Sequence, residues 1–279
     1  MPKPSPARNR QIYDAKEIAA YYAALDYVTP CEKLLFETYI QPGSEILDLG
    51  VGGGRTTAYL ASRAARYVGV DCAAAMIEAC RAKFPGMTFV VADAADLGCF
   101  PDSSFDAVVV AFNGIDFVLP GESRIACLKH IHRLLRPNGI LIFSSHNARA
   151  IFVRPSWNQA RLKQTALRFS AGSDILYRVF LPILTVARFA LALVQAGGAS
   201  LHRLLRRSAS RMFWRGEGTL VDSAHGGLLT HYWTPARAIA ELESLRFQPE
   251  RILAQEYPRS NSTYSADWYY YVFVKRDSL

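Results

Sequence analysis

A run of glycines directly after a short apolar segment is the feature that most constrains the fold of this chain. Residues 45–55 read EILDLGVGGGR. An apolar strand followed by such a turn presents bare backbone N–H groups and a helix N-terminus to a ligand. A dinucleotide-binding turn would need a third glycine where this chain has Arg55, and a P-loop would need Gly-Lys-Ser/Thr. The turn therefore predicts an α/β fold that binds neither a dinucleotide nor a nucleoside triphosphate.

Short apolar segments alternate with helical patterns along most of the chain. Strands are predicted at residues 45–49, 67–71, 87–92, 105–111, 140–144, 251–256 and 268–275. Helices are predicted within residues 12–40, at 55–63, 73–83 and 121–135, and from Thr234 and Pro235 onward. Near-continuous apolar strands separated by helices indicate a buried, mostly parallel sheet.

The length and composition favour one large globular unit. The chain has 279 residues, of which 51% are apolar and 20% charged. Its five cysteines show no C-x-x-C spacing, which argues against a disulfide framework and a structural zinc site. We expect an α/β domain formed by residues 42–146 with 232–279, preceded by a tail and helices at 1–41 and interrupted by an insert at 147–231. The cysteine content and the polar first ten residues favour a cytoplasmic location.

Acidic residues end three successive predicted strands beside the glycine turn. Asp48 lies two residues before the first glycine, Asp71 ends the second strand, and Asp93 ends the third. Ligands of open α/β sheets bind at the carboxyl ends of the strands. Carboxylates in these places suit a cationic amine, the hydroxyls of a ribose and an adenine amine, respectively.

These motifs together resemble those of the Rossmann-like, class I S-adenosylmethionine-dependent methyltransferases. The resemblance rests on the segments EILDLGVGGGR (45–55), VGVD (68–71), DCAAAMI (71–77), VADA (91–94), FDAVVVAFN (105–113) and LRPNG (135–139). Residues 235–275 resemble the closing helix and antiparallel strand pair of that family. The resemblance implies an α/β sheet that is mostly parallel with an antiparallel last strand, a helical insert, and S-adenosylmethionine as the cofactor.

The resemblance also implies a set of cofactor-binding residues. They are, for the methionine part, Asp48, Gly50, Gly52 and Gly54, with Arg55 beside them; for the ribose, Asp71; for the adenine, Cys72, Met76, Asp93 and Ala94; and for the sulfonium, Asn113. The family commonly has a serine at the position of Cys72, which is a small departure.

The sequence excludes one class of methyl acceptor. The fourth strand ends AFNGID, unlike the Asn/Asp-Pro-Pro-Tyr/Phe of enzymes that methylate the adenine amine. We expect O-methylation of a sugar, a glycolipid or another small hydroxylated metabolite. Two alternatives stay open: methylation of a lipophilic ring such as a quinone precursor or polyketide, and a non-catalytic S-adenosylmethionine-binding scaffold at a membrane or nucleic acid.

Two residues are candidates for a base that deprotonates an acceptor hydroxyl. His146 follows the strand at 140–144, and an imidazole titrates near neutral pH. Asp116 follows the fourth strand in a similar location. The residues His225, His231 and Tyr232 precede the last helix and are candidates for a segment that covers the acceptor. No spacing of histidine, cysteine and aspartate predicts a metal site.

The insert carries most of the positive charge. Residues 149–215 contain twelve Lys or Arg and one acid, whereas the whole chain has a net charge of +8. The apolar residues 175–194 include two arginines and a proline, which argues against a membrane-spanning helix. Residues 201–215 are basic, amphipathic and aromatic, as in helices that lie on membrane surfaces. We therefore expect segment 175–215 to contact anionic membranes and to present a small-molecule or lipid-linked acceptor, with a packed lid and a dimer surface as alternatives. Nucleic-acid binding is not predicted, because no recognisable RNA-binding module accompanies the charge.

Overall fold

The computed structural model describes residues 5–149, 175–176, 179, 183, 215–222, 228–259, 261 and 266–276. Its strands are β1 (Ser44–Leu49), β2 (Ala64–Asp71), β3 (Thr88–Val91), β4 (Phe105–Val110), β5 (Leu135–His146), β6 (Glu217–Asp222), β7 (Leu228–Trp233), β8 (Phe247–Ala254) and β9 (Trp268–Lys275). Its helices are α1 (Pro6–Tyr13), α2 (Lys16–Ala23), α3 (Pro30–Tyr39), α4 (Thr57–Ala61), α5 (Ala74–Lys83), the 3-10 turn η1 (Gly114–Phe117), α6 (Gly121–Leu134) and α12 (Pro235–Ser244).

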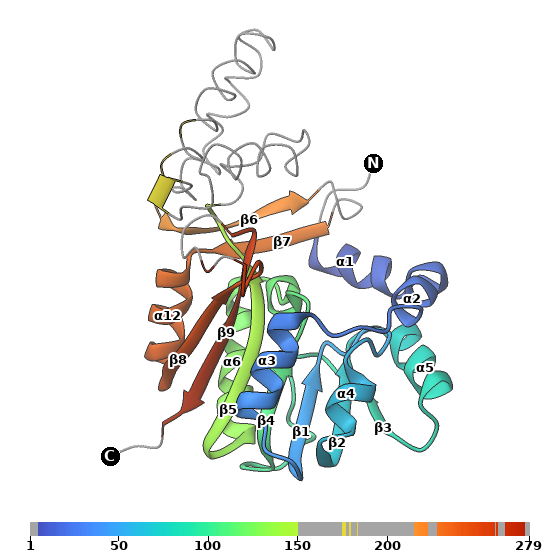
Figure 1. The fold of residues 1–279 in the computed structure, drawn as a ribbon. Helices are drawn as coiled ribbons and strands as arrows, with labels where there is room; N and C mark the ends of the chain where they lie inside the picture. Colours follow the sequence, from blue (N-terminus) through green and yellow to red (C-terminus); the bar gives the residue numbers. More distant parts are fainter. Residues whose placement is uncertain are drawn as a thin grey trace, which may run out of the picture.

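Seven strands form one sheet in the order β3-β2-β1-β4-β5-β9-β8, with helices on both faces (Figure 1). The strands β1 to β5 pair in parallel, and β9 runs antiparallel to both β5 and β8. The predicted mostly parallel sheet with an antiparallel last strand is therefore confirmed. The central strand β4 has the sequence FDAVVV and is almost entirely buried, which explains why its apolar run does not alternate.

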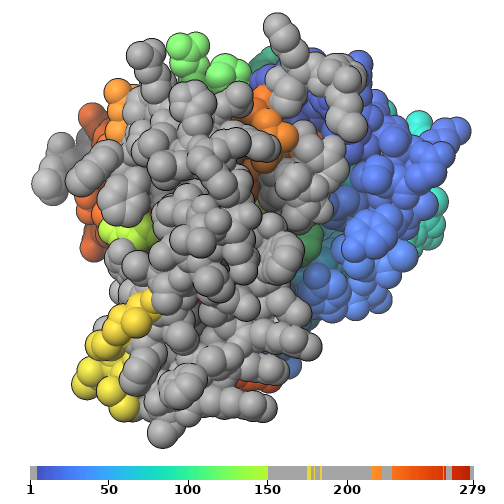
Figure 2. Space-filling view, turned by 90° about the horizontal axis from the view of Figure 1, so that it is seen from above, coloured from blue at the N-terminus to red at the C-terminus, as the bar shows by residue number. Residues whose placement is uncertain are grey.

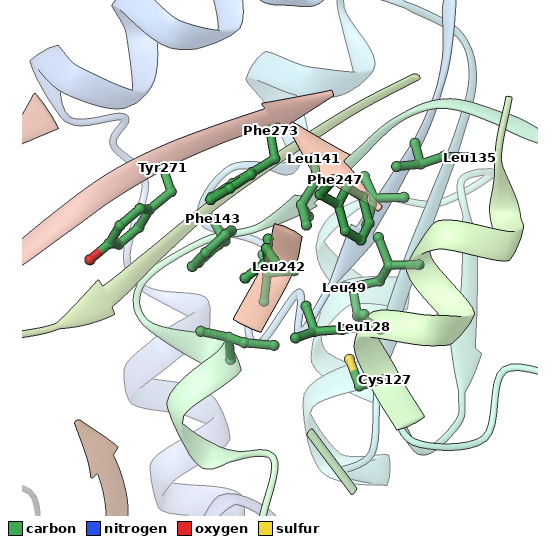
Figure 3. Packing of buried hydrophobic residues seen from close by; sticks show 14 of the residues in the cluster. Leu49, Cys127, Leu128, Leu135, Leu141, Phe143, Leu242, Phe247, Tyr271 and Phe273 are labelled. Carbon is green, nitrogen blue, oxygen red and sulfur yellow. The ribbon is translucent and has the colours of Figure 1, made fainter. Parts of the chain in front are cut away.

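Successive side chains of each strand enter opposite faces of the sheet, so two apolar cores form. One core contains Leu49 of β1 together with Leu128 of α6 and Leu242 of α12 (Figure 3). In this core the rings of Phe143 and Tyr271 stack with centroids 4.8 Å apart. The other core joins Ile46 to residues of α3. Each face of the sheet is thus covered by its own helices, and the carboxyl edge of the parallel strands is left for a site.

The predicted helical region 12–40 separates into the end of α1, α2 and α3, and α1 begins earlier, at Pro6. Helix α3 begins with a capping box, in which the Thr29 hydroxyl accepts the Glu32 N–H and the Glu32 carboxylate accepts the Thr29 N–H. The strand predicted at 140–144 also begins earlier, at Leu135. The pairing of β4 with β5 shifts register at this point, so residues 136–139 bulge out of the ladder, with Asn138 at φ +58°.

The described end of the predicted helical insert at 147–231 contains two strands. Strands β6 and β7 pair there as an antiparallel hairpin, and the proposed boundary at 231/232 falls inside β7. The alternation of Leu228, Thr230 and Tyr232 with their neighbours has the period of a strand, and pairing with β6 satisfies its backbone. Most of the insert, including most of segment 175–215, lies outside the described residues. Among the residues that are described, no helix is long and apolar enough to cross a membrane.

Helix α1 lies at the carboxyl edge of the sheet beside β7 (Figure 1), and in the view from above the blue N-terminal segment occupies one side of the molecule (Figure 2). The Asn9 side chain pairs with the backbone of Leu229 in β7, donating to its carbonyl at 2.6 Å and accepting its N–H at 2.9 Å. Asp14 accepts the N–H of Ala75 in the first turn of α5. The Lys83 ammonium donates to the carbonyl of Ala23, the last residue of α2, and to that of Leu25 just after it. These contacts hold α1 and α2 at defined points of the rim.

Gly53 is the closest point between the glycine turn and α2, and we predict that it tolerates no side chain. A Cβ at this position would lie 2.2 Å from the Ala23 backbone nitrogen, so α2 must move. Overpacking of this kind costs about 1–3 kcal/mol. Gly53→Ala should lower the urea-derived free energy of unfolding by that amount. Gly98→Ala is the control, because its Cβ would meet only an Asp96 side-chain atom at 3.5 Å. Equal stability of the two variants would contradict the close approach.

Candidate cofactor and active site

A cavity of about 520 Å³ opens at the carboxyl edge of the parallel strands, which is within the ordinary range for small-molecule sites. Residues of the glycine turn, of α1 and Tyr22 of α2 line it. The predicted site residues that line this cavity are Gly50, Gly52, Arg55, Asp71, Cys72, Met76, Asp93, Ala94, Asn113 and His146. Asp48, Gly54 and Asp116 do not appear in its wall.

The turn leaves open space in front of two glycines. Gly50 and Gly52 have φ values of +75° and +54°, which disfavour other residues, and a Cβ on either would meet nothing within 4 Å. Bare backbone therefore faces the cavity, and a ligand can lie directly against it. Gly54 has a different role from the one expected. A Cβ there would lie 2.7 Å from the Phe84 ring, so Gly54 permits packing against α5 instead of contacting a ligand.

Asp71 ties the turn to the second strand. Its Oδ2 accepts the Gly52 N–H at 2.9 Å, and its Oδ1 accepts the Ala73 N–H at 2.9 Å. Burial raises the pKa of Asp71, and these backbone hydrogen bonds offset part of the rise. Each carboxylate oxygen can accept a further hydrogen bond. The arrangement can therefore receive the two hydroxyls of a ribose.

Asp48 lies behind the cavity wall, which corrects its expected place beside the methionine part of the cofactor. Its side chain is fully buried, and Oδ2 accepts hydrogen bonds from Thr56 (2.9 Å) and Tyr67 (2.8 Å). Oδ1 has no partner in the described structure. Burial raises the pKa of Asp48 to about 6. Thr56 itself lines the cavity, so Asp48 orients a wall residue.

Arg55 reaches the cavity as half of a buried ion pair. Its guanidinium contacts both Glu32 oxygens, at 2.8 and 2.5 Å, and donates to the Tyr27 carbonyl. The rings of Tyr27 and Phe112 lie on the same guanidinium, with centroids 4.9 and 5.1 Å from Cζ. Arg55 therefore forms part of the cavity wall, where these contacts hold it in place and Glu32 balances its charge. Sequence reasoning missed Glu32, although the Thr29–Glu32 spacing is a recognisable capping signal.

His146 and Asp116 form a buried dyad at the end of β5. The His146 Nδ1 lies 2.7 Å from Asp116 Oδ2, and the His146 N–H donates to the same oxygen at 2.8 Å. Ser145 donates to the other Asp116 oxygen. Asp116 is fully buried, which raises its pKa. Asp116 is thus not a base that touches an acceptor, as one alternative had it, because it lies behind His146 and holds the imidazole.

The His146 Nε2 points to the cavity side, where Asn113 Nδ2 lies 3.3 Å away. Because the carboxylate holds the proton on Nδ1, the neutral imidazole keeps a lone pair on Nε2. An imidazole with this tautomer can accept a proton from a bound hydroxyl. Of the other predicted residues, Tyr232 packs on the His146 ring with centroids 5.2 Å apart. His231 lies away from the cavity wall, where burial lowers its pKa to about 3, and His225 falls outside the described residues.

Several cavity residues were not found from the sequence. They are Asn9, Arg10 and Tyr13 of α1, Phe112 after β4, and Trp268 at the start of β9. No spacing or motif links these positions to the glycine turn, because only folding brings α1 and β9 to this edge. Phe112 is the exception with a local signal, since it directly precedes Asn113 in the segment that resembles the family.

A Rossmann-like sheet with a bare glycine turn and a backbone-held carboxylate at the next strand defines a protein that binds an adenosyl cofactor. Residues 46–139 match a family described as "Methyltransferase domain". Residues 46–139 therefore form a methyltransferase domain of the class I, Rossmann-like type, for which S-adenosylmethionine is the cofactor. The open backbone at Gly50 and Gly52 and the carboxylate of Asp71 fit this cofactor.

Two curated relatives show the extent of the sequence similarity. Demethylmenaquinone methyltransferase of Beutenbergia cavernae is 34% identical over 117 residues, which is 42% of this chain and 44% of the relative. Trans-aconitate 2-methyltransferase of Methylobacterium radiotolerans is 32% identical over 114 residues, covering 40% and 42%. The chain thus spans less than half the length of these relatives.

Solved structures share the fold over nearly the whole chain. The Burkholderia thailandensis 1,6-didemethyltoxoflavin-N1-methyltransferase, solved with S-adenosylhomocysteine, has a TM-score of 0.56 and 16% identity, covering 99% of this chain and 93% of its own. A Methanosarcina mazei S-adenosylmethionine-dependent methyltransferase has a TM-score of 0.55 and 19% identity, covering 91% and 100%. At these identities the likeness extends to the fold alone.

We predict that Asp71 contributes strongly to cofactor affinity. Asp71→Ala should weaken S-adenosylhomocysteine binding by about 1.5–3 kcal/mol, since it removes acceptors for the ribose and for the Gly52 N–H. Isothermal titration calorimetry measures this directly. Asp96→Ala is the matched control, because this acid is exposed and outside the cavity wall. An unchanged affinity in Asp71→Ala would refute the ribose assignment.

The buried Asp48 should make stability depend on pH. The folded protein holds the Asp48 proton more tightly than the unfolded chain does, so stability falls as the pH rises from the ordinary aspartate range to about 6. Asp48→Asn removes this titration. Relative to wild type, the variant should gain up to about 3 kcal/mol in unfolding free energy between pH 4 and pH 7. Urea titrations at both pH values test this. If the stability of wild type and of Asp48→Asn changes with pH in the same way, burial does not raise the pKa of Asp48.

Proposed function

We propose that this chain transfers the methyl group of S-adenosylmethionine to a hydroxyl oxygen of a small acceptor, with His146 as the general base. The observation that carries the proposal is the placement of His146, held by Asp116 at 2.7 Å, in the same cavity as the glycine turn. The bound cofactor supplies a methyl group that is already activated by its sulfonium. The remaining task of the protein is to orient the acceptor and remove its proton.

The residues around His146 support proton removal. The Nε2 lone pair takes the hydroxyl proton, while Asp116 keeps the ring oriented and stabilises the imidazolium that forms. The rings of Tyr232 and Trp268 lie 5.2 and 6.4 Å from the His146 ring and limit access of water. Ser145 and the backbone N–H of His146 hold the Asp116 carboxylate in place. Asp116 is therefore a positioning residue for the base.

The cavity supports an uncharged acceptor that carries a ring. Among the described lining residues near His146, Phe112 and Trp268 are aromatic, and Arg55 is neutralised by Glu32. A hydroxylated ring can pack on such a wall. This favours a ring-borne hydroxyl, whether of a sugar, a glycolipid or another small metabolite.

Methylation of a lipophilic ring, such as a quinone precursor or polyketide, is the second candidate. It is supported by the exposure of Phe112, 43% of whose surface is accessible although it lines the cavity. It is also supported by the name of one relative, a demethylmenaquinone methyltransferase. A cytoplasmic location stays a prediction, and so does the contact between segment 175–215 and anionic membranes. The exposed apolar residues Ile175, Val179 and Ile183, spaced four apart, support that contact.

His146→Ala should lower kcat for methyl transfer by about 10²- to 10⁴-fold, because the acceptor then loses its base. Affinity for S-adenosylhomocysteine should stay unchanged. His130→Ala is the control, since His130 lies on α6 beside Arg133 and outside the cavity wall. A parallel loss of cofactor binding in His146→Ala would mark His146 as structural. Cofactor binding without transfer to any acceptor would favour the scaffold alternative.

A further inference from the structure

Phe112 is a large apolar residue that lies exposed on the cavity wall, two residues after the end of β4. It lines the cavity, and 43% of its surface is accessible. Its φ is +52°, and that of the next residue, Asn113, is +60°. A positive φ is rare for a bulky residue, and backbone strain of this kind is concentrated at ligand-binding and active sites. A ligand that covers the ring would explain why the fold holds it there.

The Phe112 ring has a fixed support on one side. The Arg55 guanidinium lies over the ring, with Cζ 5.1 Å from the ring centroid. Glu32 holds this guanidinium with two hydrogen bonds, at 2.8 and 2.5 Å, and the Tyr27 carbonyl accepts a third at 2.8 Å. A cation over an aromatic face is attractive, so the contact fixes the ring. The accessible part of Phe112 is therefore a firmly held surface on which a second ring can pack.

This surface lies next to the candidate base. Asn113 directly follows Phe112, and its Nδ2 lies 3.3 Å from His146 Nε2. The Trp268 ring lies 6.4 Å from the His146 ring, at an interplanar angle of 75°. Phe112, His146 and Trp268 all line the same cavity. A hydroxyl on a ring that packs against Phe112 can therefore reach the imidazole.

The chemistry of a histidine base favours one kind of ring hydroxyl. The ordinary pKa of a phenol is about 10, whereas an aliphatic hydroxyl lies close to the value of about 16 for water. Proton transfer to a given base is easier for the more acidic hydroxyl, and general-base catalysis is efficient when the two groups are better matched. A phenol also has a flat aromatic face, which a saturated ring lacks, and aromatic pairs gain free energy beyond the area they bury.

We propose that the methyl acceptor is a phenol, whose aromatic ring packs on Phe112 and whose hydroxyl is deprotonated by His146. This inference rests on the proposed function and specifies its substrate class, with Phe112 as the residue that determines specificity. The phenol gives its proton to His146 Nε2, its oxygen forms a bond to the methyl carbon, and the carbon–sulfur bond breaks with its electron pair going to sulfur. The products are an aryl methyl ether, S-adenosylhomocysteine and an imidazolium.

Pairs of aromatic and saturated probes test this class in the protein loaded with S-adenosylhomocysteine. Phenol is compared with cyclohexanol, and 2-naphthol with decahydro-2-naphthol, by calorimetric titration. At least one aromatic probe should bind wild type about 3- to 10-fold more tightly than its saturated partner, which is the effect of one aromatic pair. With S-adenosylmethionine in place of S-adenosylhomocysteine, the aromatic probe should also be methylated faster than its partner.

Variants of Phe112 separate the ring from its apolar bulk. Phe112→Leu keeps an apolar side chain but no ring, and it should reduce the preference to below about twofold with unchanged affinity for S-adenosylhomocysteine. Phe112→Tyr keeps the ring and should keep the preference. Tyr27→Leu is the matched control, because the Tyr27 ring lies on the same guanidinium, with its centroid 4.9 Å from Cζ, but is not part of the cavity wall. This control should leave the preference intact.

The outcomes distinguish the inference from the proposed function. Equal binding of aromatic and saturated probes, no binding of either aromatic probe up to about 1 mM, or a preference that survives in Phe112→Leu would each overturn the inference. An equal loss of preference in Tyr27→Leu would assign the effect to Arg55, and a matching loss of S-adenosylhomocysteine affinity in Phe112→Leu would assign the ring to the cofactor; both results overturn it as well. Methyl transfer to saturated alcohols as fast as to phenols would overturn the phenol class and leave the proposed function standing. Preferential binding of phenols without any transfer would refute the proposed function and leave Phe112 as a ring-binding residue.

Discussion

The two backbone hydrogen bonds that Asp71 accepts are the contacts on which the site depends. They join the glycine turn after β1 to the end of β2 and the start of α5. A turn with open space in front of two glycines would otherwise have few contacts to hold it, since it has no side chains to pack there. The same carboxylate also faces the cavity, so the group that shapes the turn is placed to contact the ligand.

Buried charge is paired or neutralised throughout the described site. Glu32 and Arg55 form a buried ion pair that joins α3 to the segment after the turn, and Asp116 pairs with His146. Asp48 differs from these pairs. Burial raises its pKa to about 6, which favours the protonated, uncharged form. Such groups are costly to bury, and here each of them orients a residue of the cavity wall.

Much of the sheet could be predicted from local pattern. The strands β1, β2, β3, β4 and β9 were found close to their true bounds because each is a short run of mostly apolar residues. The hairpin of β6 and β7 was missed, since its two short strands gain their stability from each other and from Asn9 of α1. Gly50, Gly52, Asp71 and His146 were placed at the cavity by their positions at strand ends.

The sequence by itself determined the α/β class, the glycine turn and the carboxyl edge where a ligand binds, because these follow from residues close together along the chain. Only the tertiary structure decided which acids contact the cavity: Asp71 does, whereas Asp48 and Asp116 lie behind its wall. It also decided that Asp116, thirty residues before His146, holds that imidazole and leaves an Asn113 oxygen unpaired. The reason is physical. A strand end specifies where a side chain starts, but the direction and partners of that side chain depend on neighbouring strands that folding brings within hydrogen-bond distance.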